Sequence, residues 1–361
     1  MCQAFTEMPS GERYRTGPSM TERSRLRSAV AAISRHSAAS SMVGMLERIS
    51  YQAPYLVPVL TYHRVAPRSA TDLDPGLISA TPEELDDHIR YLASRFRFLT
   101  LADVIAVRQG TARISRRSIL VTFDDAYRDF LDHAWPVLER HAAPVTLFVP
   151  TGYPDAPTSV FPWERLYQAI TRSHRSAVVD ALPPRTADAD RLAKYRVVHR
   201  LIADLPWGAS MAAIDRLVAE LEPPLLDNPV LGWKELRMLA SRGVELAAHT
   251  RWHVRLDRAP ASAVDREIRG SLSDLAQRIG HAPPVLAYPA GHHDEIVVER
   301  ARKAGVQIAF TTRRGLNDIR SCDWLRMRRI NVGPRSSLSL IRAQLLPALR
   351  VLTDDQRSSS L

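Results

Sequence analysis

The stretch Ser118-Ile119-Leu120-Val121-Thr122-Phe123-Asp124-Asp125 decides the fold, because six strand-forming residues end there in two adjacent acids. A short, almost continuous apolar run predicts a strand buried on both faces, which is typical of parallel sheets. Six further runs along the chain are expected to form strands. They lie at Leu56–Tyr62, Pro144–Val149, Val244–Ala248, Val285–Tyr288, Gln307–Thr311 and Arg326–Val332.

Helical patterns separate most of these predicted strands. The segment that begins Thr81-Pro82-Glu83-Glu84 combines a threonine N-cap, a proline in the first turn and a glutamate that completes a capping box. This alternation predicts an α/β fold in which helices pack outside a parallel sheet, open or closed into a barrel. The other main helices are expected at Arg128–His141, Gly232–Arg242, Ala261–Ile279, Asp294–Ala304 and Ser336–Leu346.

The chain divides into four expected parts. Residues 1–54 form a basic, partly flexible N-terminal segment, in which a modest helix over Ser24–Ile49 could lie on a membrane, dock on its own domain or stay mobile. Residues 55–352 form the patterned domain, and residues 353–361 form a flexible tail. Repeated prolines and helical patterns at about 151–230 predict a helical insertion in that domain, not a second catalytic domain.

Composition restricts the partners that we expect. The 361 residues carry a formal charge of +10, and almost all the basic residues are arginines, which suit contacts to carboxylate and phosphate groups. A solvated basic surface explains the same charge, and no helix has the basic stripe of a nucleic-acid binder. Two cysteines, Cys2 and Cys322, offer no disulfide framework.

The membrane and compartment predictions rest on apolar runs. No run approaches the roughly 18 apolar residues of a membrane span. The first fifty residues lack the apolar core of a signal peptide. We therefore expect a cytoplasmic protein, with peripheral contact at the inner membrane face as an open alternative. The oligomeric state is not predicted.

Polar side chains follow the predicted strands at their carboxyl ends, where active sites of parallel α/β folds form. Asp124 and Asp125 follow one strand, and His249 and His253 follow another, four residues apart. Each pair alone is compatible with a structural role, as helix-capping aspartates or satisfied histidines. Together, two imidazoles and a carboxylate with one position left open are typical of a catalytic metal site.

A third strand ends in Tyr288-Pro289-Ala290-Gly291. A tight turn at this edge can direct backbone N–H groups at a reacting oxygen. A turn with a purely structural role has the same sequence pattern, so this segment alone leaves both interpretations open.

With these motifs in order, the sequence resembles the polysaccharide deacetylase family, also called carbohydrate esterase family 4 or the nodulation-protein-B homology domain. The resemblance covers roughly residues 57–332. The Asp124-Asp125 pair and the His249-x-x-x-His253 motif are its most specific parts. Weaker segments fall in the expected order, at Leu60–Val65, Ala287–Gly291, Phe310–Thr312 and Arg329–Val332.

The resemblance implies a fold and a role for each matching residue. The implied fold is a distorted (β/α) barrel, an irregular relative of the TIM barrel. Asp125, His249 and His253 would bind a divalent metal, usually zinc, with cobalt or nickel as substitutes. Asp124 would be the general base that takes a proton from water, and the Ala290 N–H would help to hold the oxyanion.

The sequence departs from the family pattern at three positions. Ala290 stands where many members have tyrosine, and the arginine that often precedes the motif proline is replaced by the run Leu286–Tyr288, so that Arg329 could take over the task of orienting the base. No histidine follows His293, although the family's general acid is a late histidine. His63 is the favoured substitute, with His292, His293 or a water molecule as alternatives.

Three functions remain compatible with the sequence. The leading one is a hydrolase that removes N-acetyl groups from a polysaccharide, oligosaccharide or glycan precursor. A second is an amidohydrolase acting on a non-sugar amide, whose cleft the insertion narrows. A third is a non-catalytic glycan-binding homologue, although retention of both Asp124 and Asp125 argues against it, since binding needs no base. Some tryptophans could contact a glycan or simply pack: Trp163, Trp207, Trp233, Trp252 and Trp324.

Overall fold

The structure is a computed structural model that describes residues 55–70, 73–114, 117–156, 159–183, 190–223 and 229–346. The predicted N-terminal helix and the C-terminal tail at 353–361 lie outside these residues. No helix among the described residues is long and apolar enough to cross a membrane.

The centre of the molecule is a curved sheet whose strands are all parallel. Its strands are short, and nearly every residue in them is buried, as the apolar runs predict. β5 (Arg97–Phe98) adds to β6 outside the main path. In spatial order the path is β10 (Ile308–Phe310), β9 (Val285–Ala287), β8 (Glu245–Ala248), β7 (Thr146–Val149), β6 (Ser118–Phe123), β2 (Val59–Tyr62) and β12 (Ile330–Asn331).

The segment from Met327 to Asn331 bridges the two edges of this sheet. Met327 forms a parallel bridge to Phe310 of β10, while Ile330 and Asn331 pair with β2. The strands therefore close into an irregular (β/α) barrel, as the sequence predicts. The predicted strand over Arg326–Val332 is nevertheless wrong in length, because this segment changes partner midway and only two of its residues form a regular ladder.

Strand register brings the polar motifs to one end of the barrel. Tyr62 pairs with Phe123, and Val149 pairs with Ala248. The residues that follow these strands, including Asp124 and His249, consequently emerge at the same rim.

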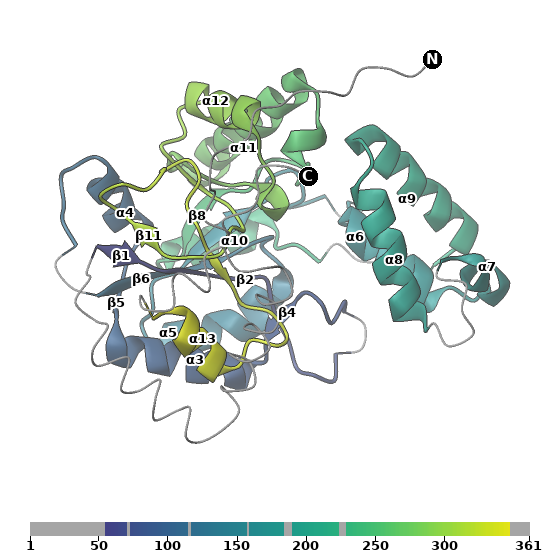
Figure 1. The fold of residues 1–361 in the computed structure, drawn as a ribbon, viewed down its shortest axis with the longest axis horizontal. Helices are drawn as coiled ribbons and strands as arrows, with labels where there is room; N and C mark the ends of the chain where they lie inside the picture. Colours follow the sequence, from purple (N-terminus) through teal and green to yellow (C-terminus); the bar gives the residue numbers. More distant parts are fainter. Residues whose placement is uncertain are drawn as a thin grey trace, which may run out of the picture.

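Helices cover the outside of the barrel (Figure 1). α3 begins with the predicted capping box: the Thr81 hydroxyl accepts from the Glu84 N–H at 3.2 Å, and the Glu84 carboxylate accepts from the Thr81 N–H at 2.9 Å. The helices around the barrel are α3 (Pro82–Arg95), α4 (Leu101–Arg108), α5 (Trp135–Arg140), α10 (Trp233–Ser241), α11 (Ala261–Ile279), α12 (Glu295–Lys303) and α13 (Leu338–Gln344).

Two helical assignments differ from the sequence interpretation. The helix expected at Arg128–His141 begins as a π-helical turn, Phe130–Ala134, before α5. Pro136 explains the difference, because proline lacks an N–H and its ring displaces the carbonyl of the preceding turn. α4 was not predicted, although its capping box of Thr100 and Asp103 was a readable signal.

In its described residues the insertion forms four helices, which lie to one side of the barrel (Figure 1). α6 packs against both α8 and α9 and shares an apolar core with them. Leu166, Ile170 and Leu221 are fully buried in this core. The helices are α6 (Pro162–Arg172), α7 (Ser176–Ala181), α8 (Arg191–Ala203) and α9 (Trp207–Leu221).

A buried ionic cluster joins the insertion to the barrel. The Arg64 guanidinium donates to Asp129 at 2.7 Å and to Glu164 of α6 at 2.9 Å. The Tyr127 hydroxyl also donates to Glu164, at 3.1 Å, and accepts from the Trp163 indole N–H at 2.9 Å. Burial raises the pKa of both Asp129 and Glu164 even though Arg64 lies against them. Arg64 is therefore the cation that allows two buried acids to share this site.

We expect Arg64→Met to lower the free energy of unfolding by about 3–5 kcal/mol at neutral pH, because it leaves Asp129 and Glu164 buried without a cation. Urea denaturation measures this change. Arg68→Met is the matched control, since the Arg68 side chain is 52% exposed and its ion pair with Glu84 is solvated, so we expect a loss below about 1 kcal/mol. Equal stability of the two variants would show that the cluster does not anchor the insertion.

Candidate active site

Asp125, His249 and His253 lie together at the rim of the barrel. One ligand atom from each falls within 4.8 Å of the other two. The Asp125 Oδ1 lies 3.4 Å from His249 Nε2 and 3.3 Å from His253 Nε2. Asp125 and His249 are buried, and the His253 side chain retains 12% exposure. The sequence expectation that these three side chains converge agrees with this geometry.

The donor atoms fit a divalent metal. His249 Nδ1 lies 2.8 Å from the Ala287 carbonyl oxygen, an acceptor, so Nδ1 donates this hydrogen bond and Nε2, which faces Asp125, is the atom that a metal would take. Asp125 Oδ1 is buried and has no hydrogen-bond partner among the described residues. A buried carboxylate oxygen without a donor is costly unless a cation compensates it. Burial lowers the pKa of His253 to about 4, which keeps this imidazole neutral, as a ligand must be.

The backbone at this rim adopts conformations that side-chain-bearing residues rarely take. Asp125, Thr250, His253 and Ala290 have φ values of 72°, 62°, 51° and 52°. Non-glycine residues in this region cost about 1–3 kcal/mol each and persist only where the surroundings impose them. Their concentration at one rim indicates a functional site.

Glu267 of α11 supports the loop between the two histidines. Its carboxylate Oε2 accepts from the Arg251 N–H at 2.9 Å and from the Trp252 N–H at 2.8 Å. These two residues lie between His249 and His253, so one carboxylate fixes the loop that carries both imidazoles. The sequence interpretation missed Glu267, because it reads as an ordinary polar position within a helix.

Asp124 lies beside the group of Asp125, His249 and His253 and is held by Arg329. The guanidinium donates to both carboxylate oxygens, at 2.8 and 2.7 Å, and Arg329 is fully buried. Burial opposes ionisation of Asp124, but the charges of Arg329 and His249 hold its pKa below the usual range. Arg329 thus occupies the orienting position that the sequence left open, and it reaches Asp124 from the segment that closes the barrel.

His63 follows β2 at the same rim. Its backbone N–H donates to the Ser79 hydroxyl at 2.9 Å, and its imidazole is close enough to help lower the pKa of Asp124 and Asp125. The other candidates for the acid have structural surroundings. His293 stacks on Tyr288 with ring centroids 5.1 Å apart, and His292 lies 3.5 Å from Arg255. His63 stays the predicted acid.

Ala290 lies exposed in the tight turn Pro289–Gly291 that follows β9, with a left-handed φ of 52°. Thr312 fixes this turn by donating from its hydroxyl to the Ala290 carbonyl at 3.1 Å. Gly291 has a φ of 73°, and a Cβ there would lie 2.1 Å from the Thr312 hydroxyl, so only glycine fits.

The insertion contributes one wall of the site. The Trp163 ring packs edge-on against His253 with centroids 4.5 Å apart, and Phe161 lies 6.0 Å from the same imidazole. Trp163 is itself fixed through Tyr127 in the ionic cluster that contains Arg64. Packing of the insertion therefore bears directly on the orientation of His253.

A family model described as polysaccharide deacetylase matches residues 112–309, more than half of the chain. The Bacillus subtilis (strain 168) protein YxkH, whose name places it in the same family, is 18% identical over 82% of this chain and 78% of its own. A poly-beta-1,6-N-acetyl-D-glucosamine N-deacetylase of Staphylococcus epidermidis is 30% identical over 104 residues, which cover 26% of this chain and 36% of that protein.

Solved structures show the same architecture. The Streptococcus pyogenes deacetylase PplD in complex with acetate matches with a TM-score of 0.55 and 18% identity, over 81% of this chain and 99% of that one. A de-N-acetylase from Aggregatibacter actinomycetemcomitans matches with a TM-score of 0.54 and 16% identity, over 80% of this chain and all of that one. At these identities the likeness concerns the fold.

We expect Glu267→Gln to weaken zinc binding at least tenfold, because the outer residues that hold metal ligands typically contribute 10- to 100-fold in affinity. Competition with a chromophoric chelator measures the affinity of the purified protein. Glu299→Gln on α12 is the control, since this carboxylate is 46% exposed and pairs with Arg302 on its own helix. Equal affinities for both variants would mean that the loop holds its shape without Glu267.

Proposed function

Because the chain belongs to the polysaccharide deacetylase family, hydrolases that act on carbon–nitrogen bonds, we propose that it is a metal-dependent deacetylase that hydrolyses N-acetyl groups of a saccharide. The single observation that carries the proposal is the buried group of Asp125, His249 and His253 beside a second carboxylate, Asp124, fixed by Arg329. In this proposal Asp125 binds the cation, and Asp124 takes the proton.

Asp125, His249 and His253 would hold the metal, with zinc the expected ion and cobalt or nickel as substitutes. The donor set of two nitrogens and one oxygen suits these ions and leaves room for substrate and water. When bound, the metal supplies Lewis acidity, which polarises the amide carbonyl and makes water more acidic.

Asp124 accepts a proton from the attacking water. Its two oxygens are fixed by Arg329, so the carboxylate is ionised and cannot rotate when the proton arrives. The bidentate contact matches the planar fork of arginine, which lysine would not reproduce.

Two further residues complete the proposed reaction. The backbone N–H of Ala290 donates to the oxygen that becomes negative as water adds to the acetyl carbon. His63, at the carboxyl end of β2, then donates a proton to the nitrogen of the departing sugar amine, and the products are acetate and a free amino sugar. The same residues could cleave a non-sugar amide, and a substrate panel separates these two activities. The cytoplasmic location and peripheral membrane contact remain proposals.

We expect the purified protein to bind about one zinc ion per chain and the His249→Ala/His253→Ala double variant to bind none. Elemental analysis after zinc loading and desalting measures both. His281→Ala is the control, because this exposed histidine lies outside the metal-binding group. Absence of zinc from the loaded wild-type protein would contradict the metal site, whatever the substrate.

We expect Asp124→Asn to reduce turnover of acetylated chito-oligosaccharides by 10²-fold or more, the usual contribution of a general base, while about one zinc per chain is retained. Released acetate reports the activity. Circular dichroism verifies the fold, because the change leaves Arg329 buried without its counter-charge. Undiminished turnover in a folded, zinc-loaded variant would remove Asp124 from the mechanism.

A further inference from the structure

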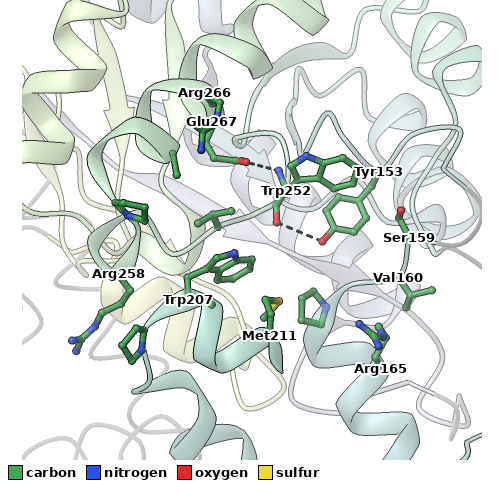
Figure 2. Close-up of a pocket in the computed structure, with 16 residues that line it drawn as sticks. Tyr153, Ser159, Val160, Arg165, Trp207, Met211, Trp252, Arg258, Arg266 and Glu267 are labelled. Atoms are coloured by element: carbon green, nitrogen blue, oxygen red, sulfur yellow. Dashed lines mark hydrogen bonds between the residues drawn. The ribbon is translucent and has the colours of Figure 1, made fainter. Parts of the chain in front are cut away.

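The loop that carries both proposed histidine ligands is held by side chains as well as by its backbone. Arg251 and Trp252 lie between His249 and His253, and their N–H groups donate to the Glu267 carboxylate of α11. Figure 2 shows the hydrogen bond from the Trp252 N–H. The side chains of these two residues make separate contacts, with α11 and with the segment that follows β7.

The Arg251 side chain extends along α11 to Asp274, about two turns beyond Glu267. Its Nε donates to one carboxylate oxygen of Asp274 at 2.9 Å, and its Nη2 donates to the other at 3.3 Å. The first of these oxygens also accepts from the hydroxyl of Thr151 at 2.7 Å. Thr151 is buried and lies just after β7. Asp274 therefore joins the loop to both α11 and the end of β7.

Gly270 provides the space for this side chain. It lies in the middle of α11 and has no positive φ, so its backbone conformation does not require glycine. Glycine at such a position weakens a helix relative to alanine. A Cβ on Gly270 would lie 2.3 Å from Cδ of Arg251 and 3.1 Å from both its Cγ and its Nε. The stem of Arg251 thus lies directly on the helix backbone, and an alanine would displace it.

Glu267, Gly270 and Asp274 form one stripe of α11, because residues three and four positions apart share a face of a helix. Glu267 accepts from the loop backbone, Gly270 leaves space for the stem of Arg251, and Asp274 binds its guanidinium. This face of the helix is therefore complementary to Arg251 from its N–H to the end of its side chain.

Trp252 lies on a glycine in the same way. A Cβ on Gly152 would lie 2.7 Å from Cδ2 and Cε2 of the Trp252 indole. The Gly152 N–H donates to the Arg251 carbonyl at 2.8 Å, and the Thr151 N–H donates to the Thr250 carbonyl at 3.0 Å. The segment after β7 thus holds the loop backbone, while α11 holds the Arg251 side chain.

Several anchors are needed because the loop backbone is strained. Thr250 and His253 have φ values of 62° and 51°, on either side of the two anchored residues. Residues other than glycine keep such conformations only where their surroundings impose them. Arg251 lies between these two positions, so a contact that fixes its side chain opposes relaxation of the loop.

We propose that Arg251, Gly270 and Asp274 form a latch that positions the loop and thereby sets the metal affinity of His249 and His253. The three are positioning residues, which act through the loop. The Arg251 side chain is 43% exposed, so its ion pair is solvated and contributes little to global stability. The effect of the latch is therefore local. Its effect on metal affinity rests on the proposed function, whereas its effect on the loop does not.

Gly270→Ala tests the latch, because it changes zinc affinity and stability in different directions. Zinc affinity of the full chain, measured by competition with a chromophoric chelator, should fall about tenfold, the lower end of the range for residues that hold metal ligands. The urea midpoint of the zinc-free protein should stay the same or rise, because alanine favours the helix. Gly208→Ala on α9 is the matched control, since a Cβ there has nothing within 4 Å, and it should leave zinc affinity unchanged.

Arg251→Ala should weaken zinc binding to the same extent as Gly270→Ala. The double variant should bind zinc no more weakly than Arg251→Ala alone, because no side chain remains to be displaced. Arg300→Ala is the control for loss of an ion pair, since Arg300 of α12 pairs with Asp265 of α11. Additive losses in the double variant would overturn the proposal, as would unchanged zinc affinity in both single variants. A matching fall in the urea midpoint of Gly270→Ala would also overturn it, because it would show general destabilisation.

Hydrogen exchange in the zinc-free protein separates failure of the latch from failure of the proposed function. Mass spectrometry of a peptide that spans residues 249–253 should show faster exchange in Gly270→Ala and Arg251→Ala than in the wild-type protein or Gly208→Ala. Unchanged exchange in both latch variants would overturn the proposal, whatever the zinc content. Absence of zinc from the wild-type protein, together with faster exchange in these variants, would refute the metal site and leave the latch as the support of the loop.

Discussion

The contact between Arg329 and Asp124 is the interaction on which the rest of the structure depends. Arg329 lies within the segment that bridges β10 and β2, and Asp124 follows the central strand β6. The same guanidinium also donates from Nε to the Thr311 carbonyl at 3.0 Å, at the end of β10. The same residue, Arg329, therefore closes the barrel and orients the proposed base. Opening the barrel at this segment would leave the Asp124 carboxylate buried without its counter-charge, which is strongly destabilising.

The sequence predicted those features that depend on neighbouring residues. Buried runs such as Ser118–Phe123 predicted the strands, and because parallel strands end at a common rim, they also predicted that Asp125 and His249 would meet. Arg329 remained one option among several, since 205 positions separate it from Asp124 and only the closed barrel brings them together. Glu267 had no local signal, because its two hydrogen bonds are made to a loop that precedes it by fifteen residues or more.

The insertion is part of the site and not an appendage of the barrel. Arg64 binds one acid from each side of the junction, and Tyr127 links that cluster to the indole of Trp163. Trp163 in turn packs on the imidazole of His253. The sequence marked this region only by its prolines and helical patterns. Its effect on His253 arises from contacts between segments that are distant in the chain.

The five-residue loop from His249 to His253 combines converging side chains with an unusual backbone conformation. Both imidazoles must converge on Asp125, which requires positive φ values at Thr250 and His253. Hydrogen bonds from the N–H groups of Arg251 and Trp252 to Glu267 support this strained backbone, while the Trp252 side chain stays 40% exposed. The same loop is also held by backbone hydrogen bonds from Thr151 and Gly152 to the Thr250 and Arg251 carbonyls. Because Arg251 and Trp252 lie between His249 and His253, any contact that moves their backbone also bears on the orientation of both imidazoles.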